Sequence, residues 1–117
     1  MFRFESLEIW HSSRDYAGKI YNLTKGFPKT EIYGISDQLR RSAGSIPANI
    51  AEGSGSPSKK DFSHFLDIAQ KSLYETVSHL YIAKDQNYIN EDQRQRIYDS
   101  AEQLMRQIKK FQYTLRT

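Results

Sequence analysis

Cysteine is absent from the sequence of 117 residues. This absence excludes a disulfide framework, a thiolate metal site and a cysteine nucleophile. Long apolar runs are also missing, because the longest covers only residues 80–83, whereas a membrane-spanning helix needs roughly 20 such residues. The first ten residues carry Glu5 and Glu8 and lack the apolar region of a secretory signal. We therefore expect a cytoplasmic protein that makes no contact with a membrane.

Acidic residues are scarce at the C-terminal end of the chain. The formal net charge of the whole chain is +3. From Arg94 onwards, six basic residues accompany only two acidic ones, Asp99 and Glu102. This mild excess permits attraction to phosphates, but it is smaller than that of many dedicated nucleic-acid-binding proteins.

Strand-like alternation of apolar and polar residues is missing, and helical periodicity replaces it. Apolar residues recur every three or four positions in four segments, at about 7–25, 36–52, 59–86 and 91–115. Because each segment is apolar along one stripe only, the four helices need one another to form a core. Short connections favour neighbours that run in opposite directions. The sequence therefore predicts an all-α fold, an antiparallel up-down-up-down four-helix bundle, as one domain over residues 1–117.

Several residues predict where the helices begin and bend. Ser36 is the expected N-cap of the second helix, and Pro47 lies inside that helix, where we expect a kink. Ser58 and Asn90 open the third and fourth helices, each followed three residues later by a side chain that can complete a capping box. The expected core stripe of the first helix is Leu7, Trp10, Ala17, Ile20, Tyr21 and Thr24. Those of the other three helices are Leu39, Ala43, Ile46 and Ile50; Phe62, Phe65, Leu66, Ala69, Leu73, Val77 and Leu80; and Ile97, Ala101, Leu104, Ile108, Phe111 and Leu115.

Three stretches carry a resemblance to a known family: residues 27–34, 38–53 and 62–73, of which the second contains QLRR and SIPANIAEG. The single tryptophan, Trp10, fits the same pattern. On these residues the chain resembles the 23S rRNA intervening-sequence four-helix-bundle proteins, and it is similar to the accessory variability protein of diversity-generating retroelements. The resemblance implies an antiparallel four-helix bundle that assembles into a homopentameric ring.

The resemblance also implies partners. The retroelement relative binds nucleic acid and a reverse transcriptase, whereas no biochemical activity is established for most of the family. Further copies of the chain, RNA, DNA and a reverse transcriptase are therefore candidate partners, and no cofactor is implied. One departure from the family pattern is Lys71, at a position where the family tends to have glycine. A lysine there either prevents the close approach of a second helix or places this surface outward.

Eight basic residues are candidate nucleic-acid contacts. Arg40 and Arg41 are adjacent and lie about 100° apart on a helix, so they cannot both face one partner. Either could reach a phosphate, or could pair with a carboxylate such as that of Asp37. The other six, with four tyrosines that could stack on bases, are Lys59, Lys60, Lys71, Arg106, Lys109 and Lys110, and Tyr74, Tyr81, Tyr98 and Tyr113. The alternative is a solvated helix face, since nearby carboxylates dilute the positive charge.

A line of small residues in the second helix predicts a close helix contact. Gly44, Pro47 and Ala51 share a face there, which is either a subunit interface or tight packing within the bundle. Asn49 and Glu52 flank this face and could fix the helix register or an interface contact. These five residues form the candidate oligomer interface.

No group of residues predicts catalysis or a metal centre. Glu8 and His11, like Asp61 and His64, have a spacing related to that of di-iron bundle ligands. However, we expect Glu8 and His64 to point away from the core. The glycine-rich stretch 53–56 lacks the lysine of a phosphate-binding loop. We therefore expect a non-enzymatic protein without catalytic residues, bound metal or cofactor.

Two functions follow from these features. In the first, the chain forms a homo-oligomeric, ring-like assembly that binds structured RNA through a basic outer surface. In the second, the assembly is a scaffold for another protein, such as a reverse transcriptase, and does not touch nucleic acid itself. Salt-sensitive binding of RNA distinguishes them, because phosphate contacts release counterions.

Overall fold

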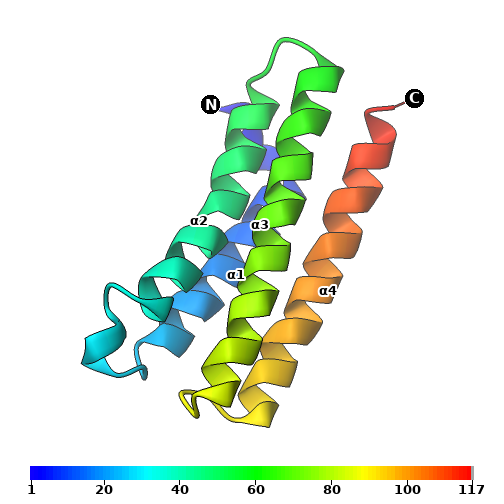
Figure 1. Ribbon diagram of the computed structural model, residues 1–117. Coiled ribbons are helices and arrows are strands. Elements are labelled where there is room, and N and C mark those ends of the chain that lie inside the picture. The colour runs from blue at the N-terminus through cyan, green and yellow to red at the C-terminus, as the bar shows by residue number, and fades with distance from the viewer. Residues whose placement is uncertain (117) are drawn as a thin grey trace.

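Four helices account for most of the chain in the computed structural model, which describes residues 1–116 (Figure 1). They are α1 (Glu8–Thr24), α2 (Ile35–Ser54), α3 (Lys59–Asp85) and α4 (Glu91–Thr114). Two short 3-10 helices precede α1 and α2, namely η1 (Arg3–Ser6) and η2 (Lys29–Glu31). No strand occurs within this described range, so the predicted all-α class is confirmed. Thr117, the last residue of the predicted domain, lies outside the described residues.

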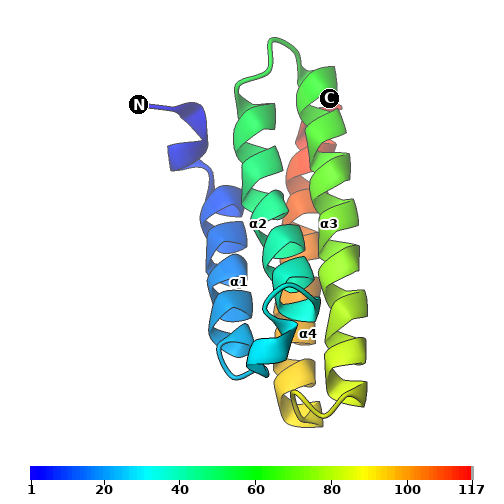
Figure 2. The same ribbon diagram turned by 60° about the vertical axis from the view of Figure 1, so that its left-hand side comes forward.

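The helices form an antiparallel bundle in which consecutive helices pack side by side. The last helix, α4, also packs on α1, so each helix has two neighbours. Both chain termini lie at one end, and the α1–α2 and α3–α4 loops lie at the other (Figures 1 and 2). The bundle is elongated and measures 45 × 23 × 20 Å along its principal axes. The up-down-up-down prediction is therefore confirmed. Across the described residues, no helix combines the length and the apolar character that a bilayer crossing requires.

Local caps set the boundaries of α3 and α4 as predicted. Asn90 and Gln93 form a reciprocal capping box, in which each backbone N–H donates to the side-chain oxygen of the other residue at 2.8–2.9 Å. Ser58 Oγ accepts from the backbone N–H of Asp61 at 3.1 Å. At the other end of α3, Asn87 adopts a left-handed conformation with φ of 62°, which suits a helix C-terminus.

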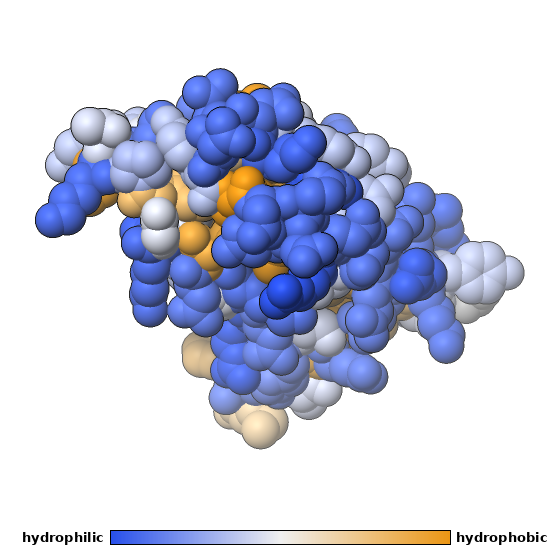
Figure 3. Space-filling model, turned by 90° about the horizontal axis from the view of Figure 1, so that it is seen from below, coloured by the Kyte–Doolittle hydropathy of each residue, from blue (hydrophilic) through white to orange (hydrophobic). Residues whose placement is uncertain are grey.

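The start of α2 is capped by Glu31, which precedes the helix and is also bonded by Tyr88. The predicted N-cap, Ser36, is wrong, because it is buried within the first turn of a helix that begins at Ile35. Instead, the Glu31 carboxylate accepts from the Ile35 N–H (3.4 Å) and from the Tyr88 hydroxyl (2.7 Å). Gly34 leaves room for that carboxylate, since a Cβ there would lie 2.2 Å from Glu31 Oε1. Glu31 therefore ties the two loops together at this end, whose surface is mainly hydrophilic with a small hydrophobic area (Figure 3).

The core runs along the bundle and includes apolar residues of all four helices. The predicted stripes of α2, α3 and α4 supply most of it, and α2 continues through Pro47 as one helix. The buried members of those stripes are Leu39, Ala43, Ile46, Ile50, Phe62, Leu66, Ala69, Leu73, Leu80, Ile97, Ala101, Leu104 and Ile108. Burial of this surface is the main force that holds the bundle together.

The core face of α1 differs from its predicted stripe. Tyr21 is 46% exposed, whereas Ser13 and Tyr16 are buried. Both buried hydroxyls have partners: Ser13 Oγ donates to the Trp10 carbonyl (2.8 Å), and Tyr16 shares a 2.8 Å hydrogen bond with Thr76 Oγ1. The predicted residues Ile20 and Thr24 are buried, and Leu7, Trp10 and Ala17 pack against the core. Because a satisfied hydroxyl can enter a core at little cost, apolar spacing alone missed Ser13 and Tyr16 and wrongly included Tyr21.

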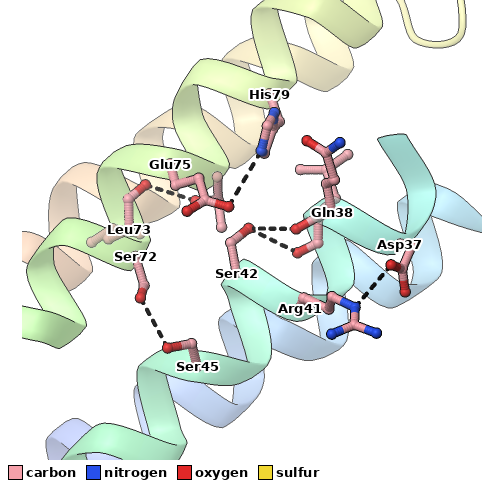
Figure 4. A network of polar contacts seen from close by, with 11 residues as sticks. Asp37, Gln38, Arg41, Ser42, Ser45, Ser72, Leu73, Glu75 and His79 are labelled. Atoms are coloured by element: carbon pink, nitrogen blue, oxygen red, sulfur yellow. Dashed lines mark hydrogen bonds and ion pairs between the residues drawn. The ribbon is translucent and has the colours of Figure 1, made fainter. Parts of the chain in front are cut away.

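Small side chains let α2 and α3 approach closely. Ser72 Oγ donates to Ser45 Oγ across this seam at 2.9 Å (Figure 4). The neighbouring Lys71 is exposed, so the lysine points outward and does not separate the helices. At the far end of α2, Gly53 lies against α3, where a Cβ would stand 2.7 Å from Phe62 Cδ1 and 2.8 Å from a Phe65 carbon.

We predict that Gly53→Ala lowers the free energy of unfolding by about 1–3 kcal/mol, because the added methyl group overpacks the α2–α3 seam. Gly18→Ala is the matched control, because a Cβ there meets nothing within 4 Å and alanine favours the helix by up to about 1 kcal/mol. Urea denaturation monitored by circular dichroism measures both changes. Equal stability of the two variants would contradict the close contact at Gly53.

Candidate nucleic-acid interface between α3 and α4

Polar side chains set the register of α4 on α3. Gln112 is buried, and its Nε2 donates to the Ser63 carbonyl (3.0 Å) and to Asp67 Oδ1 (2.7 Å). Its Oε1 accepts from Gln70 Nε2 at 2.9 Å. A buried amide with both ends bonded specifies one arrangement of its helices. These bonds fix the C-terminal half of α4 beside α3.

A groove runs along the outer seam of α3 and α4, which lie side by side in Figure 1. Its volume is about 370 Å³. Below it lie the core residues Leu73 and Ala101. The side chains that form its walls and rim are Tyr74, Val77, Tyr98, Glu102, Met105, Arg106 and Lys109. The groove is therefore apolar and aromatic inside, with two cations and one carboxylate beside it.

Tyrosines mark both sides of this seam. Tyr74 and Tyr98 line the groove, and Tyr74 is 68% exposed. Tyr81 follows Tyr74 two turns later on α3 and is also exposed. Tyr113 is equally exposed at 69%, but it does not line the groove. Two of the four predicted stacking residues therefore lie at one site.

Arg94 is held between two of these rings. Its guanidinium carbon lies 4.6 Å from the ring centre of Tyr81 and 5.5 Å from that of Tyr98. Arg94 is only 6% exposed, although its sequence position counts toward the basic C-terminal end. It therefore contributes to the order of the seam more than to the positive surface.

Hydrogen bonds hold the Arg94 guanidinium in this position. Its Nε donates to both carboxylate oxygens of Glu91, at 3.0 and 3.1 Å, and its Nη2 contacts Glu91 and Gln95. Within the described residues, the buried Nη1 has no hydrogen-bond partner. The bonds from Arg94 lower the pKa of Glu91 below its ordinary value of 4.5, and Glu91 in turn raises the pKa of Arg94.

The predicted nucleic-acid contacts are divided among several surfaces. Arg106 and Lys109 line the groove. Lys110 does not line the groove but lines a second hollow near the start of α1. The remaining lysines, Lys59, Lys60 and Lys71, are exposed on α3 but do not line the groove. The structure thus brings together two of these six residues and leaves the others as separate predictions.

The two arginines of α2 both make contacts within the chain. Arg40 Nε donates to Thr24 Oγ1 at 2.8 Å, and its guanidinium lies 5.2 Å from the Tyr21 ring centre. Arg41 is exposed and forms a 2.8 Å ion pair with Asp37, as Figure 4 shows. Arg40 therefore joins α2 to α1, whereas Arg41 remains accessible on the surface.

The candidate oligomer interface lies on an accessible part of α2. Gly44, Pro47 and Ala51 are half-buried, and a Cβ at Gly44 would meet nothing within 4 Å. Tight packing inside the bundle therefore does not explain Gly44. Asn49 Nδ2 donates to the Ser45 carbonyl at 2.8 Å. Glu52 is exposed, and no hydrogen bond joins it to Asn49 in the part of the chain described.

The histidines lie apart from one another. His11 Nε2 bonds to the Glu5 carbonyl (2.7 Å), and His64 is exposed beside Phe65. In residues 1–116, no three His, Asp or Glu side chains gather in a way that could hold a metal ion.

Sequence reasoning did not identify Val77 and Met105 as part of this site. A signal was available, because Tyr74, Val77 and Tyr81 recur at helical spacing directly beside the buried stripe of α3. The spacing alone could not show which neighbouring helix would leave this flank uncovered.

The similarity of this chain to known proteins extends over almost its whole length. The family model described as 23S rRNA-intervening sequence protein matches residues 5–110. A solved structure from Bacteroides thetaiotaomicron, described as a protein with unknown function from the S23 ribosomal protein family, is 28% identical. Its TM-score is 0.81, and the match covers 89% of this chain and 97% of that chain. No curated protein matches.

We predict that the Arg94–Glu91 pair makes stability depend on pH. Because the folded-state pKa of Glu91 is lowered, its contribution is present above the unfolded value near 4.5 and is lost as pH falls through the folded value. The unfolding free energies of the wild type and Glu91→Gln, measured by urea denaturation, should therefore converge as the pH falls from above 4.5 through the lowered folded-state pKa. Glu8→Gln is the control, since Glu8 is likewise an exposed carboxylate in the first turn of its helix. A constant difference between wild type and Glu91→Gln across this range would contradict the assignment.

Proposed function

The chain belongs to the 23S rRNA-intervening sequence protein family, and from that membership we propose that it is a non-enzymatic, homo-oligomeric protein that binds structured RNA. The α3–α4 face is the contact surface in this proposal. The family's name refers to ribosomal RNA, and the name of the solved relative refers to a ribosomal protein family.

One observation carries the proposal: Arg106 and Lys109 stand at the rim of a groove that also presents tyrosine rings. Cations at such a rim can contact phosphates, and exposed rings can contact bases. The combination of cations and accessible rings favours nucleic acid over the many partners that an apolar groove without cations would suit.

Assembly would strengthen this weak positive surface. A net charge of +3 per chain is multiplied by the number of subunits when copies form a closed ring. The resemblance implies five subunits, and we include a pentamer in the proposal. The accessible face around Gly44, Pro47 and Ala51 is the proposed contact between copies, since small side chains permit close helix approach there.

A second candidate function is a scaffold for another protein, such as a reverse transcriptase, without direct contact to nucleic acid. The apolar lining of the groove favours it, because exposed tyrosine and methionine are enriched at protein interfaces. Recovery of a protein partner from nuclease-treated material, together with absence of RNA binding, would support this alternative.

We predict that RNA affinity falls steeply as salt rises, because phosphate contacts release counterions. Replacing Arg106 and Lys109 together with alanine should reduce the slope of log K against log salt by about 2 for each bound protomer, roughly one for each lost phosphate contact. Fluorescence anisotropy with a structured RNA at several salt concentrations measures this slope.

The matched control is the double variant Lys25→Ala with Lys29→Ala, which removes the same charge from exposed positions at the loop end. It should leave the slope close to that of the wild type. Absence of RNA binding at low salt, or binding insensitive to salt, would contradict the proposed function.

We predict that Gly44→Glu converts the oligomer into a monomer of 13.7 kDa. The side chain has space in the single subunit, but a carboxylate buried between copies would be strongly unfavourable. Light scattering measures the mass, and Gly18→Glu is the control at another uncrowded helical glycine. A monomeric wild type would refute the oligomer, and an unchanged mass of Gly44→Glu would place the interface elsewhere.

A further inference from the structure

We propose that the α3–α4 groove receives an unpaired base of the RNA, stacked on the ring of Tyr74, while Arg106 and Lys109 contact the flanking phosphates. This inference rests on the proposed function and specifies what its site recognises. The recognised element is a single-stranded loop or bulge, and a continuous duplex lacks it.

The size of the groove fits one nucleotide. Its volume of about 370 Å³ lies at the lower end of the roughly 300–1,000 Å³ typical of small-ligand sites. A stable protein partner instead covers about 800 Å² of each surface, and a groove of this size supplies only part of that contact. The dimensions therefore favour a small, flat group over the face of a second protein.

The aromatic and apolar side chains that line the groove suit the flat, apolar face of a base. Tyr74 exposes 68% of its surface, so its ring is accessible to a stacking partner. Val77 and Met105 provide apolar contact beside that ring. Stacking on an aromatic ring tolerates any sequence, because every base has a π face. A paired base in a duplex cannot use this site, since its faces are covered by its neighbours in the stack.

The position of the Tyr98 ring, at the end of the groove nearer the α3–α4 loop, is set by contacts within the protein. Its ring packs against the guanidinium of Arg94, which Glu91 anchors through two hydrogen bonds from Nε. The planar guanidinium also lies 4.6 Å from the Tyr81 ring centre. Arg94 is thus a positioning residue: it keeps Tyr98 in place before a ligand arrives, which reduces the entropy lost on binding.

The charges beside the groove match a nucleotide and indicate its orientation. Arg106 and Lys109 can each donate to a phosphate oxygen, and together they favour a polyanion over a neutral peptide. Glu102 is the one carboxylate of the lining within the described residues. A carboxylate repels phosphate but accepts hydrogen bonds from base amino groups. The sugar–phosphate chain therefore lies along Arg106 and Lys109, and the base edge lies toward Glu102.

The test compares two fluorescent RNAs with the same number of phosphates, a hairpin with an unpaired loop and a fully paired duplex. Anisotropy titrations at low salt should show that the wild type binds the hairpin roughly tenfold more tightly. Tyr74→Ala should abolish this preference, and Tyr74→Phe should retain it, because only the ring is needed. Tyr113→Ala is the matched control, since Tyr113 is as exposed as Tyr74 but does not line the groove.

The outcomes separate this inference from the proposed function. Equal binding of hairpin and duplex by the wild type, with a normal salt slope, would overturn the base site and leave phosphate-driven binding intact. Equal effects of Tyr74→Ala and Tyr113→Ala on the preference would also overturn it, as would a preference that survives Tyr74→Ala. Absence of binding to both RNAs would refute the proposed function and the inference together. Circular dichroism of each variant confirms that the bundle remains folded.

Discussion

Serine and glycine residues allow α2 and α3 to approach closely, and the arrangement of the rest of the bundle depends on that contact. The Ser72–Ser45 hydrogen bond and the lack of space for a Cβ at Gly53 show how little separates the two helices. Packing of this kind leaves few alternative arrangements, because a shift of one helix would drive side chains into backbone. The α2–α3 pair is therefore the most closely packed part of the molecule, and α1 and α4 pack against it.

The seam between α3 and α4 is less closely packed. Tyrosine and methionine side chains stand where serine and glycine occupy the α2–α3 seam, so a groove remains above the core. Polar groups hold α4 on α3 at both ends: Gln112 bonds to α3 near the C-terminus of α4, and Arg94 packs on the ring of Tyr81 near its N-terminus. This division places rigid packing on one side of the bundle and an accessible, chemically varied surface on the other.

A binding role agrees with the presence of an accessible groove on one side of a closely packed bundle. The groove combines aromatic rings, apolar side chains and cations, all of which lie on the helices α3 and α4. Its charge is modest in one chain, so an assembly of several copies would present a much stronger field to a polyanion. The buried Arg94 shows that basic residues in a sequence need not add to the surface, because one of them serves to order the tyrosines.

The sequence by itself determined the helical class, three of the four core stripes and the caps at Ser58 and Asn90, since helical periodicity and capping act between residues close in the chain. The family resemblance was also evident there and is confirmed. Only the tertiary structure decided that Tyr16 faces the core, that Glu31 caps α2 and that Arg40 bonds to α1. The partners of Tyr16 and Arg40 are distant in sequence, and Glu31, although close to Ile35 in the chain, is also bonded by the distant Tyr88. For the same reason the groove could not be predicted: its residues come from two helices, and the space between them is set by the sizes of side chains that meet only after folding.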